Sequence, residues 1–206
     1  MKQPQTIALT AILAVTVGMI GINGALGDTF GFNSSPEIAT NDVQAYKGHI
    51  ILKHFDAEGN LVGYQQTDNV VNFAGKNCAA FLTFGTAFAN CATGVAFDFI
   101  ALSTDTGVGF AEGDATLVGE CSTCGAGLNA RIQGTVSANT AAVGTTDAIA
   151  QIQQSFTKTD AGLATIASAG LFNAVTGGEM FAEKGFASVG LNQNDSLLVT
   201  WLITVA

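Results

Sequence analysis

Apolar and polar residues alternate along the end of the chain. Leu197, Val199, Trp201, Ile203 and Val205 fall on one side of a period-two repeat, with Leu198, Thr200, Leu202 and Thr204 on the other. Because successive side chains of a β-strand point to opposite faces, this pattern predicts a strand. The strand is mostly apolar and carries the single tryptophan of the chain, so we expect Trp201 to anchor the hydrophobic core.

A second apolar run, Met180 to Leu191, precedes this strand, and the turn-forming residues 192–196 separate the two. Turn residues between two β-rich runs are typical of antiparallel strands that follow each other along the chain. We therefore interpret the end of the chain as a strand pair that closes a sheet.

Further β-rich runs occur upstream. Val43 to Phe55 and Leu61 to Asn72 flank a short polar loop suited to a hairpin. Alternating patterns predict three more strands, at 97–102, 128–137 and 145–159. In the second of these, Arg131 falls on the polar side of the repeat, which we expect to face solvent.

Residues 72–88 depart from the period of two. Their alanine, leucine and phenylalanine residues cluster as on a helix that covers one end of a sheet, so we expect a short helix near Ala74 to Phe84. Only 11% of residues are charged, while glycine and β-branched residues are abundant. Together these patterns predict an all-β fold, an antiparallel β-sandwich of jelly-roll or immunoglobulin-like kind with one short helix.

The N-terminus differs from the rest of the chain. A cation at Lys2, an uncharged apolar run, and small residues at Ala25 and Gly27 match a secretory signal peptide over residues 1–27. The alternative is an uncleaved membrane-anchor helix, since the run is long enough to span a bilayer. Residues 28–42 form a polar arm or linker, and 43–206 form the β-domain. Either reading places that domain outside the cytoplasm, in the extracellular space or at the cell surface.

Four cysteines lie in the exported part: Cys78, Cys91, Cys121 and Cys124. An even number of cysteines in an exported chain points to disulfides, and three pairings are possible. We favour Cys78–Cys91 and Cys121–Cys124, because each pair encloses a short segment. A four-thiolate zinc site is the weaker alternative, since only one pair has CxxC spacing.

The charge balance and the motifs exclude several classes of function. The net charge is −9 and the few cations form no run, so nucleic-acid binding is not expected. His49 and His54, five residues apart on one predicted strand, point to opposite faces and cannot act as a pair. No nucleophile-elbow, phosphate-binding or zinc-protease motif is present. We therefore expect no catalytic residues and no enzyme activity.

Two kinds of minor site remain open. The acidic loop 103–120 carries weak calcium candidates, although their spacing does not match an EF-hand and a solvated loop is favoured over any metal site. They are Asp105, Glu112, Asp114 and Glu120. Asn33 and Asn194 each begin an Asn-x-Ser tripeptide that could accept a glycan. No cofactor other than a possible Ca²⁺ is expected.

Four motifs follow one another along the chain, in the segments Phe97–Thr104, Asp114–Glu120, Ala169–Ala174 with Gly177–Ala182, and Asp195–Trp201. Their order resembles that of the F-x-I-A-L-G-T, D-T-x-L-x-x-E, E-x-G-L-F-N and D-S-L-x-V-T-W motifs of tail-fibre or virion-surface proteins of tailed phages. The similarity covers about Asp68 to Ala206. The acid before G-L-F is replaced here by Ser168 and Ala169, and phage structural proteins seldom carry a signal peptide. The resemblance therefore implies a structural role in an exported cellular or proviral relative.

Three functions follow from these features. We expect first an exported structural or adhesive protein at the cell surface or in extracellular filaments, which associates with itself or with other surface proteins. The edge strands of such a fold are open to pairing, and the polar arm 28–42 and the apolar terminal strand offer a route to assembly by strand addition. The alternatives are a secreted carbohydrate- or calcium-binding module, and a virion or tail-fibre component.

Overall fold

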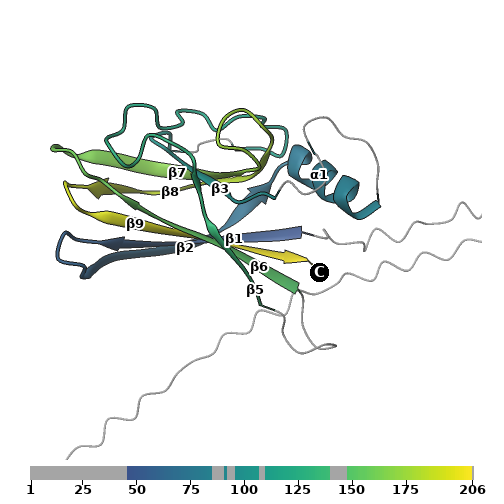
Figure 1. Cartoon of the computed structure of the whole chain (residues 1–206), viewed down its shortest axis with the longest axis horizontal. Coiled ribbons are helices and arrows are strands. Elements are labelled where there is room, and N and C mark those ends of the chain that lie inside the picture. The colour runs from purple at the N-terminus through teal and green to yellow at the C-terminus, as the bar shows by residue number, and fades with distance from the viewer. Residues whose placement is uncertain (1–45, 85–90, 92–95, 107–109, 140–147, 206) are drawn as a thin grey trace, which may run out of the picture. The chain divides into compact units, whose positions relative to one another are not determined.

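The computed structural model describes residues 46–84, 91, 96–106, 110–139 and 148–205, and it is mostly antiparallel β-structure with one helix (Figure 1). The elements in chain order are β1 (Tyr46–Phe55), β2 (Leu61–Val71), α1 (Phe73–Phe84), β3 (Phe99–Ser103), β4 (Ile132–Gln133), β5 (Thr135–Asn139), β6 (Ala148–Thr157), β7 (Ala164–Phe172), β8 (Met180–Leu191) and β9 (Ser196–Val205). The expected signal peptide, the arm 28–42 and Asn33 lie outside the described residues.

The nine strands form one sheet in the order β4-β3-β7-β8-β2-β1-β9-β6-β5. Neighbouring strands pair in antiparallel fashion throughout. The sheet folds back on itself, so that β7 and β8 lie in one layer and β1 and β2 in the other (Figure 1). The hydrophobic core fills the space between these layers.

The sheet is nearly closed because the chain crosses between the layers at two places. At the first, Val70 and Val71 at the end of β2 pair with Glu183 and Ala182 of β8. At the second, Gly134 separates β4, which pairs with β3, from β5, which pairs with β6. A Cβ at this glycine would lie 3.0 Å from the Gln153 carbonyl oxygen, so the crossing needs a residue without a side chain.

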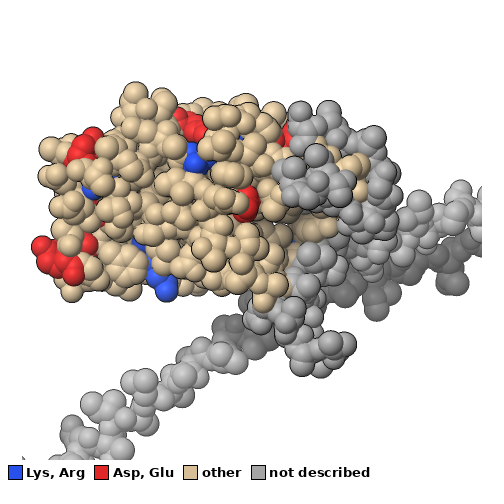
Figure 2. All heavy atoms as spheres, viewed as in Figure 1, with Lys and Arg blue, Asp and Glu red and all other residues tan. Residues whose placement is uncertain are grey.

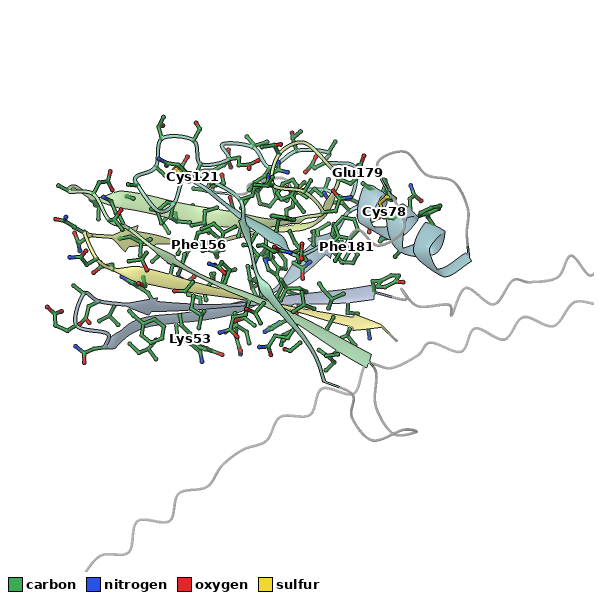
Figure 3. All side chains as sticks on the ribbon, viewed as in Figure 1. Lys53, Cys78, Cys121, Phe156, Glu179 and Phe181 are labelled. Carbon is green, nitrogen blue, oxygen red and sulfur yellow. A yellow bond between two sulfur atoms is a disulfide. The ribbon has the colours of Figure 1, made fainter. Side chains whose placement is uncertain are left out.

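The core is built around the last strand, as its pattern predicts. Trp201 is fully buried, and Phe156 of β6 is buried in the same cluster. Figure 3 shows the Phe156 and Phe181 side chains between the two layers. Because β9 lies between β1 and β6, its apolar side chains reach both neighbouring strands of the core.

Two expected elements are confirmed almost to the residue. The hairpin of β1 and β2 turns through residues 56–60, where the Asp56 carboxylate accepts hydrogen bonds from the backbone N–H groups of Glu58 and Asn60. The helix α1 covers one end of the sheet, and its Gly75 packs directly against the backbone of Phe181. A side chain at Gly75 would prevent this close approach.

The expected pairing of the last two runs is wrong. The strands themselves exist, but β8 pairs with β7 and β2, whereas β9 pairs with β1 and β6. The turn after Leu191 therefore carries the chain from one layer to the other. Leu191 and Leu197, on either side of this turn, are both fully buried, so the two strands contribute to the core from opposite layers.

The expected strand 128–137 is only partly correct, because regular structure begins at Ile132. Gly125 and Gly127 adopt left-handed backbone conformations, with φ of 136° and 87°, and they turn the chain before the strand starts. Leu128 is fully buried, but it lies in this turn. Leu128 is apolar because it packs in the core from a loop, and in the sequence it fits the alternating pattern of a strand.

Strand β7 was not predicted as a strand. All of its residues except Thr165 are buried, so it shows no alternation of apolar and polar side chains. It lies between β3 and β8, where both of its faces are covered. Sequence alternation reports only strands that have one wet face.

Candidate functional site

The edge of β2 that faces β8 is largely unpaired. Among the described residues, 61–69 of β2 pair with β1 alone, and only Val70 and Val71 continue into a ladder with β8. Farther along, a side chain bridges the two strands, because the Gln65 amide donates a hydrogen bond of 2.9 Å to the Ala187 carbonyl. We call the region between residues 61–69 of β2 and 184–190 of β8 the seam.

A pocket of about 280 Å³ opens at the seam. Its lining includes the core side chains Leu52, Val189 and Leu197, together with Tyr64 and Ser188. The three core side chains belong to β1, β8 and β9. The pocket therefore leads from the surface to the apolar space between the layers.

The β8 side of the seam is irregular. Its register against β7 shifts between Ile166, which pairs with Val189, and Ser168, which pairs with Gly185. Three residues of β8, 186–188, thus stand opposite one residue of β7, and Ala187 and Ser188 are exposed. Such bulges occur often at sheet edges, where they end or redirect pairing.

The β2 side carries exposed apolar side chains. Leu61, Val62 and Tyr64 are 53%, 55% and 52% exposed. Asp68 is the only charged residue in this strand, and the strand contains neither lysine nor proline. Natural edge strands are commonly protected by those two residues. The edge of β2 is therefore open to pairing with another strand.

The two histidines lie on different faces of β1, and each contacts an acid. His49 Nδ1 lies 2.9 Å from Asp68 Oδ1 at the surface, and His54 Nε2 lies 3.4 Å from the nearly buried Asp195 Oδ2. His54 also lines the pocket at the seam. These contacts are structural hydrogen bonds between neighbouring elements, and they bring no nucleophile to either ring.

A buried acid that the sequence did not single out lies at the junction of β8 and α1. Glu183 is fully buried, and neither of its carboxylate oxygens has a hydrogen-bond donor within 3.5 Å among the described residues. Burial first, and then the neighbouring Asp114 carboxyl, raise the pKa of Glu183 from 4.5 to about 8, against a smaller opposing effect of Asn72. A glutamate inside the apolar run of β8 was the available sequence signal.

The four calcium candidates of the acidic loop do not converge. Glu120 forms a two-pronged ion pair with Arg131, at 2.7 and 2.9 Å, and Glu112 pairs with Lys76 at 2.9 Å. Asp114 faces another acid, Glu183. In the described part of the chain, no group of three His, Cys, Asp or Glu side chains is placed to hold a metal. Asp105 follows Ser103, whose hydroxyl accepts its backbone N–H.

Arg131 does not lie on a wet face as expected. Its guanidinium stacks over the Phe172 ring, with the central carbon 3.5 Å from the ring centroid, and it also donates to the carbonyls of Ala174 and Gly177. The side chain is only 11% exposed. Arg131 is a structural clamp that fixes the loop after β7 to the acidic loop.

Two disulfides join the cysteine pairs that the sequence favours. Cys78 of α1 is bonded to Cys91, and Cys121 is bonded to Cys124, with Cα–Cα distances of 5.5 and 5.3 Å. Figure 3 labels Cys78 on the helix and Cys121 in the loop region beside β7. The disulfides indicate a non-reducing environment.

Asn194 lies in the exposed turn between β8 and β9, with a left-handed φ of 69°. In the face shown in Figure 2, charged side chains are few and scattered. Within the described residues, no helix is both long and apolar enough to cross a lipid bilayer. Comparison with models of known protein families and with curated protein sequences gives no match.

Proposed function

We propose that the protein is an exported structural subunit that assembles with further copies of itself by strand addition at the seam. The observation that carries this proposal is the unpaired edge of β2, with three apolar side chains more than half exposed. An edge that offers unpaired backbone N–H and C=O groups binds an added strand through main-chain hydrogen bonds.

The polar arm of a second copy is the donor strand in this proposal. Its segment Thr29-Phe30-Gly31-Phe32-Asn33 alternates, with two phenylalanines on the same side of an extended chain. The pocket at the seam is lined by Leu52, Val189 and Leu197, which are suitable partners for such rings. The specificity of strand addition comes from pockets of this kind for alternate side chains.

The compartment and fold support the same role. Two disulfides suit an extracellular or cell-surface location, and residues 1–27 have the features of a signal peptide. We propose that the fold is a β-sandwich of jelly-roll or immunoglobulin-like kind, since two layers enclose one core. The resemblance to tail-fibre proteins is also in keeping with a structural subunit rather than an enzyme.

Charged residues at the edge provide the first test. Replacing both Val62 and Tyr64 with lysine places two charges beside any added strand, whereas Val118→Lys changes an equally exposed residue, at 57%, in a loop. We expect high-mass assemblies of the purified protein in light scattering and negative-stain microscopy. The double edge variant should remain monomeric, and Val118→Lys should assemble normally.

Deletion of residues 28–42 provides the second test. The shortened protein should not assemble, but it should bind a synthetic peptide of residues 28–42, and the edge variant should not bind that peptide. Wild-type protein that is monomeric at every concentration would contradict the proposal. A full-length monomer that does not bind the added peptide would indicate that its own arm occupies the seam, which would also contradict assembly between copies.

A further inference from the structure

We propose that Glu183, Asp114 and Asn72 form a binding site for a divalent cation, preferentially Ca²⁺, where β8 meets the start of α1. The site lies apart from the seam and does not depend on the proposed assembly. It differs from the loop site considered from the sequence, since two of its three residues lie outside that loop.

The first observation is a set of buried oxygens without donors. Glu183 and Asn72 are both fully buried. Both carboxylate oxygens of Glu183 and the Oδ1 atom of Asn72 make no hydrogen bond of 3.5 Å or less among the described residues, so Asn72 and Asp114 act on Glu183 over a longer distance. Buried polar atoms are nearly always satisfied, so three unsatisfied oxygens on two neighbouring side chains require an explanation. A bound cation satisfies oxygens of this kind and needs no donor.

The second observation is how the residues are held. The Asn72 amide nitrogen donates to the Asp114 backbone carbonyl at 2.7 Å, which fixes the acidic loop to the start of the helix. The Asp114 carboxylate accepts the Ala111 N–H through Oδ2, at 2.8 Å. Asp114 lies close enough to Glu183 for the two carboxyl groups to interact directly. Two of the three side chains, Asn72 and Asp114, are therefore positioned by contacts that do not involve the proposed ion.

The third observation is charge. Lys76, one turn along α1, pairs with Glu112 at 2.9 Å. No ion pair joins a described cationic side chain to Glu183 or to Asp114. The two adjacent carboxyl groups thus have no cationic side chain as a partner, in a chain of net charge −9. A divalent cation supplies the missing charge.

The donor set favours calcium. Carboxylate and amide oxygens are hard ligands, and Ca²⁺ accepts them in irregular geometry and completes its shell with water and carbonyl groups. Mg²⁺ dehydrates reluctantly and usually keeps several bound waters, which suits a fully buried carboxylate such as Glu183 less well. We expect an affinity in the range of extracellular calcium modules, with a Kd of about 0.1–1 mM.

Calcium titration of the purified, chelator-treated protein tests the proposal by calorimetry and thermal unfolding. Addition of CaCl₂ at about ten times Kd should raise the Tm of the wild type by roughly 3–6 °C. Mg²⁺ at the same concentration should have a smaller effect. Glu58→Gln removes one charge at the exposed β1–β2 turn and should leave the calcium effect unchanged.

Glu183→Gln and Asp114→Asn should each weaken calcium binding at least about tenfold. Asp114 is only partly buried, so its variant remains informative if the substitution of Glu183 prevents folding. A wild-type protein with no calcium heat and no Tm shift up to about 10 mM, well above the expected range of Kd, would overturn the proposal. A calcium affinity and Tm shift in Asp114→Asn equal to those of the wild type would also overturn it.

Discussion

Substitution of Glu183 by glutamine in calcium-free buffer should make the protein more stable at alkaline pH. The folded-state pKa of Glu183 is raised from 4.5 to about 8, mainly by burial. Between pH 4.5 and about pH 8, Glu183 has lost its proton in the unfolded chain but keeps it in the folded protein. Stability therefore falls as pH rises, by about 1.4 kcal/mol per pH unit for one proton, and levels off above pH 8.

The full effect is about 5 kcal/mol at most, which is a large part of the stability of an ordinary domain. Glutamine has the size of a protonated glutamic acid but does not ionise. We expect Glu183→Gln to match the wild type near pH 4.5 and to exceed it by roughly 2–4 kcal/mol at pH 9.

Urea unfolding between pH 4.5 and 9, with a chelator present, measures this difference. The exposed Glu58→Gln variant serves as the control and should keep the wild-type pH dependence. Parallel pH profiles for the wild type and Glu183→Gln would refute the reasoning. A loss of stability in Glu183→Gln at pH 9 would refute it as well.

Three further substitutions test the packing. Trp201→Ala should lower the free energy of unfolding by about 3–5 kcal/mol in urea titration, because the ring is fully buried. Arg131→Lys should cost about 1–3 kcal/mol by the same assay, because lysine cannot keep both the forked pair with Glu120 and the stacking on Phe172. Gly134→Val should reduce Tm by several degrees in calorimetry, since a Cβ there would lie 2.9 Å from a side chain of β6.

The alternation of apolar and polar residues predicted the strands that have one buried face and one solvent-exposed face. It located β9 and the β1–β2 hairpin, and the change of period located α1. It missed β7, whose residues are buried on both faces. It also placed a strand over Leu128, where left-handed glycines make a turn.

The sequence did not predict which distant strands pair with each other. The close succession of β8 and β9 suggested neighbours, yet the two strands belong to opposite layers. Glu183 and Asp114 are 69 residues apart in the sequence, so no local motif contains both of them. Such contacts depend on how the layers fold together, which periodicity does not encode.

In the proposed assembly, a strand from another copy of the protein completes the seam. Cryo-electron microscopy of the native assemblies tests this most directly. We predict an added strand beside residues 61–69 of β2, with side-chain density that fits Phe30 and Phe32 of a neighbouring subunit in the pocket. Assemblies in which this edge of β2 stays unpaired, or in which the subunit's own chain fills it, would contradict the account.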